Sequence, residues 1–312
     1  MAFVYIFFIL IASFILIKSA QWVIKALTYL AQYFHIPEFV VAFILAGIAT
    51  SLPELFVGIS AAINKTPILS LSNLLGSNIA NLTLILGISI VLTKGINTET
   101  KASQKNIIYT FLILIYPILL AMDGNISRID GFALLIIFIL YNLILFYQSK
   151  NFSKKFEGAK KKYLIKNIFL FILGIILLLA CSEIIVRSSN LLASELKIPL
   201  FLVGLFLVAI GTSLPELVFN IKAANNQHKD MILGNILGSL VINSTAILGV
   251  TALISPIIIK NINLLISSAI FLLIAYLIFV FFAKTKKRIS WQEAFILLFL
   301  YIAFIIIQFL LK

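Results

Sequence analysis

The pentapeptide TSLPE at residues 50–54 occurs a second time at residues 212–216, 162 positions later. The similarity extends outward from this pentapeptide. Residues 36–87 align with residues 198–249 without a gap, and 26 of the 52 aligned positions are identical. Shared hydrophobicity alone can match leucines and isoleucines, but it does not duplicate a polar pentapeptide. The sequence therefore contains an internal repeat.

The repeat lies in a chain that is too apolar for a water-soluble domain. Of its 312 residues, 62% are hydrophobic and 11% are charged, and the mean hydropathy is +1.16. Soluble domains are about 45–50% apolar and about 25% charged. Long apolar runs without strict alternation predict membrane-spanning helices and exclude an outer-membrane barrel. We predict an all-α integral membrane protein with ten spans, at residues 2–28, 37–63, 68–93, 105–122, 128–148, 165–193, 199–224, 230–255, 261–283 and 290–311.

A lysine-rich loop divides these spans into two equal sets. The loop, residues 149–165, separates a first five-helix repeat, residues 1–148, from a second five-helix repeat, residues 166–312. Because five is an odd number, the two copies must cross the membrane in opposite directions. The sequence thus predicts an inverted-topology repeat, in which the binding site of a transporter forms between the repeats near the membrane midplane.

The distribution of basic residues predicts the orientation of the chain. If the central loop is cytoplasmic, 17 lysines and arginines lie on the cytoplasmic side and six lie on the other side. Basic residues are retained in cytoplasmic loops. We therefore expect a multi-pass protein of the cell membrane with both termini outside. Most of the net charge of +13 then lies next to the anionic lipids of the inner leaflet, and it does not indicate nucleic-acid binding.

Only eleven residues are acidic, and two of them occur near the middle of predicted spans. A carboxylate at that depth costs at least about 2.5 kcal/mol, so Glu54 and Glu216 are expected to face a cavity or a cation. Helical spacing places Thr50 and Ser51 on the face of Glu54. Thr212 and Ser213 occupy the same positions relative to Glu216.

Two further features point to a polar site at the same depth. Pro53 and Pro215 cannot donate to the carbonyl four residues earlier, so the helix is expected to be distorted and to leave carbonyl oxygens free. Such backbone is tolerated in a membrane only where it is buried or lines a cavity. The span that follows each pentapeptide carries one stripe of polar residues at helical spacing: Asn73, Ser77 and Asn81 in the first copy, and Asn235, Ser239 and Asn243 in the second.

Together these residues form a set of oxygen donors without sulfur or imidazole. Ca²⁺ and Na⁺ prefer such ligands. Two glutamates carry the charge that neutralises one Ca²⁺, and two or three Na⁺ could compete for the same oxygens. A helix-packing motif is the structural alternative. It accounts for Gly76, Gly87, Gly238 and Gly249, which we assign to packing, but it does not account for the glutamates.

The duplicated Thr-Ser-Leu-Pro-Glu and Gly-Ser-x-x-x-Asn segments resemble the two alpha-repeats of the sodium/calcium exchangers, within the cation/calcium exchanger superfamily. The resemblance covers nearly the whole chain. It implies a prokaryotic-type antiporter that extrudes Ca²⁺ as Na⁺ enters, by alternating access in which two helices slide against a helical core. It implies no cofactor besides the transported ions, and no partner besides the lipid bilayer.

The resemblance also implies roles for individual residues. Glu54 and Glu216 would bind Ca²⁺ with the backbone carbonyls of Thr50 and Thr212. The flanking Na⁺ sites would use Ser51, Ser77 and the carbonyl of Gly47, with Ser213, Ser239 and the carbonyl of Ala209 as their equivalents, and Asn81 and Asn243 would line the centre. Asn243 departs from the Asp of many relatives, which makes K⁺ co-transport an unfavoured hypothesis. Ala49 and Ser72 replace glycines that the second repeat keeps.

Other functions fit the sequence less well than Na⁺/Ca²⁺ exchange. An H⁺-coupled exchanger of Ca²⁺ or another divalent cation is the nearest alternative, because a carboxylate can bind a proton in place of Na⁺; the many hydroxyl groups favour Na⁺. A cation channel is a remote alternative, because two inverted copies converge on one site instead of forming a ring around a pore. No sequence motif supports an enzyme. Glu183 and Arg187 are interpreted as an ion pair within one helix and not as transport residues.

Overall fold

The structure is a computed structural model that describes residues 1–33, 50–97, 101–148, 163–225, 229–285 and 288–310. The first half of the described chain contains helices α1 (Ala2–Tyr33), α3 (Leu52–Ile63), α4 (Pro67–Ala80), α5 (Leu86–Thr93), α6 (Lys101–Leu120) and α7 (Arg128–Gln148). The second half contains α8 (Leu164–Leu196), α9 (Leu200–Leu202), α10 (Ala209–Thr212), α11 (Leu214–Asn225), α12 (Lys229–Ile242), α13 (Leu248–Ile254), α14 (Ile262–Thr285) and α15 (Trp291–Leu310).

Three π-helical segments and a short 3-10 helix interrupt or extend these helices. They are η2 (Asn81–Ile85), η5 (Val203–Val208) and η6 (Asn243–Ile247), and the 3-10 helix η3 (Ala121–Asp123). The strands are β1 (Ile96–Asn97), β2 (Asn125–Ile126), β3 (Ile257–Ile258) and β4 (Arg288–Ile289). Within the described residues, nine helical segments are long and apolar enough to cross a membrane. The all-α membrane fold is therefore confirmed, and α3 lies in the described part, residues 50–63, of the predicted span 37–63.

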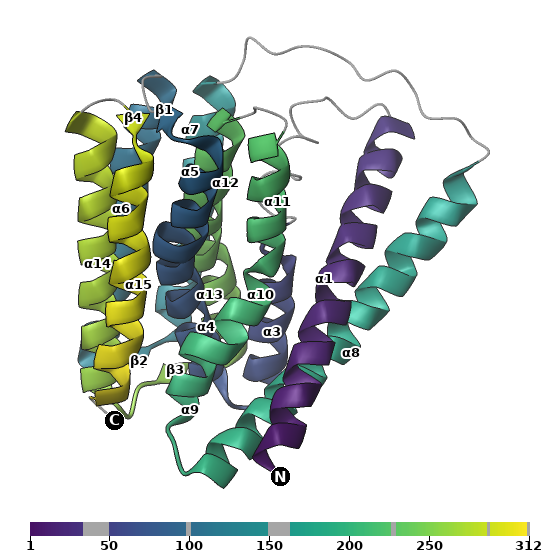
Figure 1. The fold of residues 1–312 in the computed structure, drawn as a ribbon. Helices are drawn as coiled ribbons and strands as arrows, with labels where there is room; N and C mark the ends of the chain where they lie inside the picture. Colours follow the sequence, from purple (N-terminus) through teal and green to yellow (C-terminus); the bar gives the residue numbers. More distant parts are fainter. Residues whose placement is uncertain (34–49, 98–100, 149–162, 226–228, 286–287, 311–312) are drawn as a thin grey trace.

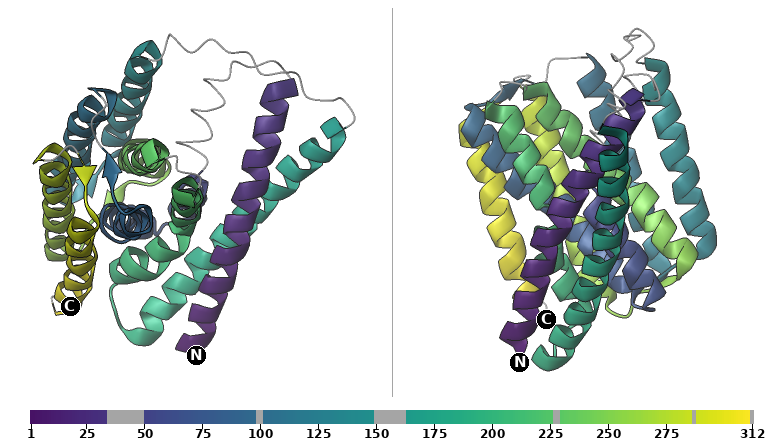
Figure 2. Two further views of the ribbon diagram at one scale, coloured as in Figure 1. Left: turned by 45° about the horizontal axis from the view of Figure 1, so that its top comes forward. Right: turned by 90° about the vertical axis from the view of Figure 1, so that its right-hand side faces the viewer.

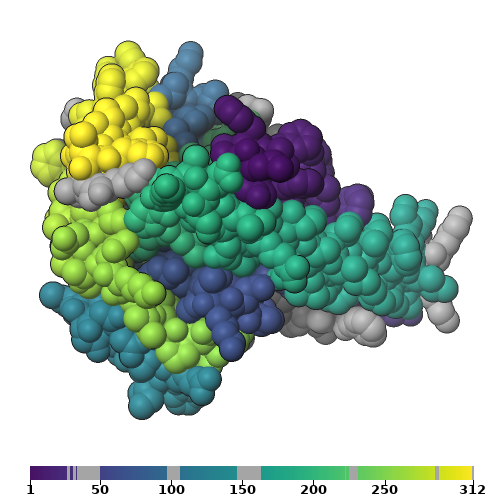
Figure 3. All heavy atoms as spheres, turned by 90° about the horizontal axis from the view of Figure 1, so that it is seen from below, coloured from purple at the N-terminus to yellow at the C-terminus, as the bar shows by residue number. Residues whose placement is uncertain are grey.

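Two long helices stand partly apart from the rest of the bundle. Helix α1 packs along α8, and the pair leans across one side of the molecule, while α14 and α15 lie on the opposite side (Figures 1 and 2). Seen from below, α8 extends well beyond the remaining helices (Figure 3). The pair shares a separate apolar cluster with α3 and η5, in which Leu16, Val57, Ile185 and Val208 are buried.

The two halves of the chain have the same local structure at an offset of 162 residues. Helices α4 and α12 are both 14 residues long and begin at equivalent positions, and the π-helices η2 and η6 begin at Asn81 and Asn243. The halves run in opposite directions, because α5 leads to β1 at the top of Figure 1 whereas α13 leads to β3 at the bottom.

Two small antiparallel ladders join the halves at opposite ends of the bundle. In one, β1 pairs with β4, with Ile96 opposite Ile289. In the other, β2 pairs with β3, with Ile126 opposite Ile257. Each ladder takes one strand from each half (Figure 1). The ends of the two halves are thereby fixed to each other on both faces of the protein.

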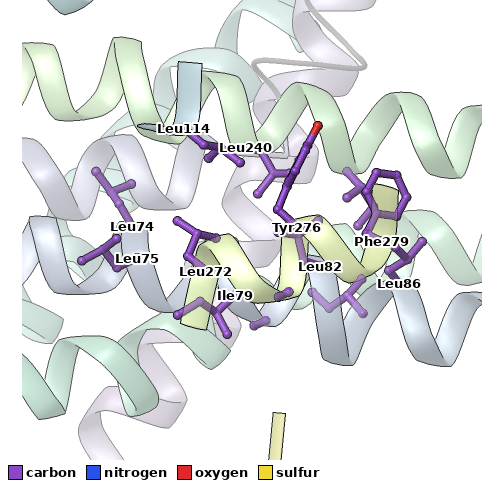
Figure 4. Close-up of a cluster of buried hydrophobic side chains, with 14 of the residues drawn as sticks. Leu74, Leu75, Ile79, Leu82, Leu86, Leu114, Leu240, Leu272, Tyr276 and Phe279 are labelled. Atoms are coloured by element: carbon purple, nitrogen blue, oxygen red, sulfur yellow. The ribbon is translucent and has the colours of Figure 1, made fainter. Parts of the chain in front are cut away.

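The main apolar core surrounds the α4–η2–α5 rod. Figure 4 shows Leu82 and Leu86 of this rod near Tyr276 and Phe279 of α14, with Leu74 and Leu75 farther along the same buried cluster. On another side the rod packs closely against η5, because a side-chain carbon at Gly76 would collide with the backbone carbonyl of Leu205. This supports the assignment of Gly76 to packing. Close approach of backbones through small residues is typical of helix contacts in membranes.

Glu183 joins α8 to α3. Its Oε1 accepts from Arg187 Nε at 2.6 Å, as expected for a pair within one helix. Its Oε2 also accepts from Ser60 Oγ at 2.6 Å and from Asn64 Nδ2 at 2.7 Å, both on the α3 side. We name this set the α8–α3 bridge. The sequence predicted the pair within the helix but not the bridge between helices.

Candidate ion-binding site

The helix is interrupted beside each glutamate. Ser51 precedes α3 with φ −88° and ψ 8°, and Ser213, between α10 and α11, has φ −84° and ψ 1°. Pro53 lies in the first turn of α3, where its missing N–H leaves no helical bond unmade. The predicted distortion at the prolines is therefore present in both copies, with almost the same backbone angles.

Both glutamate side chains are fully buried, at 0% exposure. Glu216 Oε1 accepts from Ser239 Oγ at 3.3 Å. The other three carboxylate oxygens, both from Glu54 and Oε2 from Glu216, have no hydrogen-bond partner among the residues that the structure describes. Ser77, Thr212 and Ser213 place hydroxyl groups near the Glu54 carboxylate. Buried charge of this kind requires a compensating cation or proton.

A crossed pair of hydrogen bonds joins the two halves around the glutamates. Thr50 Oγ1 donates to Asn235 Oδ1 at 3.2 Å, and Thr212 Oγ1 donates to Asn73 Oδ1 at 3.2 Å. These bonds are equivalent at the 162-residue offset. A second equivalent pair, Thr50 with Ser239 and Thr212 with Ser77, lies at 3.5 Å. Each repeat thus supplies a hydroxyl group to the polar stripe of the other.

The two central amides lie at the start of the π-helices. Asn81 and Asn243 are both fully buried. π-Helical turns are rare and often occur at functional sites. Helix α3, which carries Glu54, packs against η6, and α11, which carries Glu216, packs against η2. The amide of one repeat therefore lies on an element that contacts the glutamate helix of the other repeat.

The structure describes and buries most of the predicted site residues. Those described are Glu54, Glu216, Thr50, Thr212, Ser51, Ser213, Ser77, Ser239, Asn81, Asn243 and Ala209. All eleven are buried. Gly47 lies outside the described residues. The carbonyl oxygen of Ala209 accepts from Ser213 N at 3.0 Å and from Thr212 Oγ1 at 3.4 Å, so only part of its accepting capacity is left for an ion.

Three buried polar residues near the site were missed by the sequence comparison. Asn78 and Ser244 are bonded to each other across the repeats at 2.9 Å, and Asn220 Oδ1 accepts from Asn235 Nδ2 at 3.1 Å. Their equivalents in the other half are Leu240, Leu82 and Gly58. A search for residues shared by both copies cannot find them, whereas a search for polar residues with apolar equivalents would have done so.

The arrangement is suited to a bare or partly dehydrated cation. It combines two carboxylates with hydroxyl and amide oxygens, which are ligands of hard cations. Within the described ranges, no group of three or more His, Cys, Asp and Glu side chains is arranged to hold a metal ion. Among the described residues the charge of the site therefore comes from Glu54 and Glu216, and the remaining donors are neutral.

Comparison with known proteins agrees with this chemistry. The family model described as sodium/calcium exchanger protein matches residues 4–147 and 166–310. An uncharacterized membrane protein of Methanocaldococcus jannaschii, MJ0091, is 32% identical over 288 residues, which cover 91% of this chain and 92% of the relative. The sodium/calcium exchanger MaX1 of Methanosarcina acetivorans is 26% identical over 94% of this chain and 95% of its own length.

Solved structures give the same result. The sodium-calcium exchanger NCX_Mj, soaked with Na⁺ and Sr²⁺, is similar with a TM-score of 0.67 and 31% sequence identity, over 98% of each chain. The same exchanger soaked with Na⁺ and Ca²⁺ gives a TM-score of 0.66. The match of the family model extends over nearly the whole chain, and the protein is thus a multi-pass membrane transporter that belongs to the sodium/calcium exchanger family.

Proposed function

We propose that this protein is a Na⁺/Ca²⁺ antiporter that binds both ions at one central site. The observation that carries the proposal is the pair Glu54 and Glu216. They are fully buried, equivalent in the two repeats, and have three of four carboxylate oxygens without a hydrogen-bond partner in the described chain. Their combined charge of −2 matches one Ca²⁺.

Exchange follows from competition for these oxygens. One Ca²⁺ would bind both glutamates together with the backbone carbonyls of Thr50 and Thr212. Na⁺ ions would occupy flanking positions near Ser51 and Ser77, and near the equivalent residues of the second repeat: Ser213, Ser239 and Ala209. Both kinds of occupancy neutralise the glutamates. Binding of Ca²⁺ therefore weakens binding of Na⁺, and binding of Na⁺ weakens binding of Ca²⁺. This competition couples the two fluxes.

Alternating access requires part of the molecule to move relative to the site. The α1–α8 pair is suited to this role, because it packs against the bundle through its own apolar cluster while the two strand ladders fix the halves of the core to each other. We infer that the end of the bundle carrying β1 and β4 faces the cytoplasm, on the basis of the lysine-rich loop, and that both termini face outward. The α1–α8 pair would slide against a core made of the five-helix repeats 1–148 and 166–312 without their first helices.

The direct test is Ca²⁺ uptake into proteoliposomes of the purified protein. Vesicles are loaded with Na⁺ and diluted into Na⁺-free buffer, and radioactive Ca²⁺ inside is counted over time with the membrane potential clamped. We expect uptake only while the outward Na⁺ gradient exists. Vesicles with Na⁺ equal on both sides, and vesicles without protein, are the controls. Uptake that is independent of Na⁺ would contradict the proposal.

An H⁺-coupled exchanger is the second candidate. A carboxylate with no hydrogen-bond partner can be neutralised by a proton as well as by a metal ion. The same vesicles separate the two functions, because an imposed pH gradient in Na⁺-free buffer drives uptake only in an H⁺-coupled exchanger. The hydroxyl groups of the Thr-Ser pairs favour Na⁺, since a proton needs no further oxygen ligands.

A further inference from the structure

The two central amides, Asn81 and Asn243, occupy equivalent positions in the two repeats but have different surroundings. Asn243 Nδ2 donates to Asn78 Oδ1 at 3.0 Å, and Asn78 Nδ2 in turn donates to Ser244 Oγ at 2.9 Å. Asn78 is 2% exposed and Asn243 is fully buried. One residue of the first repeat thus holds two adjacent residues of the second. We name these three side chains the Asn78 relay.

Asn81, the equivalent of Asn243, has no such support. Neither its Oδ1 nor its Nδ2 has a hydrogen-bond partner in the described part of the chain. The positions that would form its relay are occupied by Leu240 and Leu82, which are both fully buried. Leucine can neither accept nor donate a hydrogen bond. The amide of Asn81 is therefore free to present either end, whereas the amide of Asn243 is held at its nitrogen.

The held amide leaves one buried polar atom without a hydrogen-bond partner. Asn243 Oδ1 has no partner among the described residues, although the side chain is fully buried. An amide binds a cation only through its oxygen, because the NH₂ end is a donor and carries partial positive charge. An amide whose nitrogen is already hydrogen-bonded elsewhere loses little conformational freedom when the ion binds. This is the pre-organisation that strengthens a ligand.

We propose that Asn78 is a positioning residue for ion binding: it fixes the amide of Asn243 so that Oδ1 and not Nδ2 faces the transported cation. The inference rests on the proposed function. Asn78 itself makes no contact with the ion. Its effect passes through Asn243, and the unsupported Asn81 provides the internal comparison.

The test is a double-mutant cycle on exchange in proteoliposomes. Asn78→Leu replaces Asn78 by the residue found at its equivalent position and keeps the branched shape of the side chain. A buried hydrogen bond contributes enough for about a three- to tenfold change in an equilibrium constant. We therefore expect Asn78→Leu to raise the KM for Ca²⁺ about three- to tenfold with little change in maximal rate. Asn167→Leu is the matched control, because Asn167 is also buried but donates to Tyr163 O within its own helix; its KM is expected to equal that of the wild type.

The decisive comparison is made in the Asn243→Ala background. Without the Asn243 amide, Asn78→Leu has nothing left to position, so the double variant should have the KM of Asn243→Ala alone. If the two effects multiply, Asn78 acts independently of Asn243 and the inference is wrong. An unchanged KM in Asn78→Leu also overturns it. Ser244→Ala, which removes only the outer bond of the relay, gives a weaker effect in the same direction and replaces Asn78→Leu if that variant does not fold.

These outcomes are separable from a failure of the proposed function. If the wild-type protein shows no Na⁺-dependent Ca²⁺ uptake, the antiporter proposal fails before any variant is compared. If the wild type exchanges Na⁺ for Ca²⁺ and the cycle is additive, the antiporter proposal stands and the role of Asn78 is rejected.

Discussion

The two halves of this protein share the elements that would bind ions and differ in the residues around them. The helix breaks at Ser51 and Ser213, the π-helices and the crossed Thr–Asn bonds are nearly the same in both copies. The Asn78 relay, which joins the two repeats, and the bond from Asn235 to Asn220 have no counterpart at the equivalent positions, because leucine or glycine stands there.

This difference divides the site residues into two groups: proposed ligands that are present in both repeats, and residues that support those ligands. An ion on the pseudo-twofold axis would meet equal ligands from both halves. The ligands can therefore be predicted as the polar residues that are identical in the two repeats. The residues that support the ligands are not constrained by the repeat, and they can make one half more rigid than the other. The symmetric residues should therefore give equal effects when they are mutated in pairs, whereas the supporting residues should not.

The largest effect is expected when the carboxylate charge of either glutamate, the equivalent proposed ligands of the two repeats, is removed. Glu54→Gln and Glu216→Gln should each reduce Na⁺-dependent Ca²⁺ uptake by more than about 100-fold, since a full charge facing a divalent ion in a buried site contributes several kcal/mol. Glu293→Gln is the control, because Glu293 accepts from Ser290 at the start of α15, away from the site, and should keep normal uptake. Retention of uptake in one of the two site variants would place the ion on one half only.

A smaller and equal loss is expected for the two threonines. Thr50→Val and Thr212→Val keep the shape of the side chain and each remove one equivalent 3.2 Å bond to an asparagine of the other repeat. We expect the KM for Ca²⁺ to rise about tenfold in both variants, as for loss of one buried hydrogen bond with its partner left unpaired. Effects that differ by more than about threefold would show that the crossed bonds are not functionally equivalent.

The sequence alone predicted the fold class, the helical spans and the family, because spans follow from apolar length and the repeat duplicates a polar pentapeptide. It also singled out both glutamates, since charge is expensive in a membrane, and both are fully buried; their role in ion binding stays a prediction. It did not predict the residues in contact across the repeats, such as Asn78 with Asn243 or Ser60 with Glu183. These pairs lie more than 120 positions apart in the chain and depend on how helices face each other, which periodicity within one helix does not specify.

The α8–α3 bridge extends the comparison beyond the site. The equivalents of Glu183 and Arg187 are Gln21 and Lys25, so a bridging carboxylate is available to only one half. If the α1–α8 pair moves during exchange, these bonds must break in each cycle. We expect Glu183→Ala to lower the melting temperature by a few degrees, to raise the exchange rate about threefold and to leave the KM for Ca²⁺ unchanged. Gln21→Ala should change neither the melting temperature, nor the exchange rate, nor the KM for Ca²⁺. Equal effects of the two variants would contradict the claim that only the second half has a bridging carboxylate.

The smallest effect is expected at Asn220. Its Oδ1 accepts from Asn235 Nδ2, but its own Nδ2 has no partner among the residues described. Asn220→Ala therefore removes the unpaired Nδ2 of Asn220, and it leaves Nδ2 of Asn235 without an acceptor. The first half already tolerates this state, because Gly58 leaves Asn73 Nδ2 unpaired in the described structure. We expect a change of about 1 kcal/mol or less in the free energy of unfolding and less than about threefold in the KM for Ca²⁺. A loss as large as that of Thr50→Val would mean that Asn220 positions Asn235 for its bond with Thr50, and that the second asparagine stripe depends on a support that the first does not need.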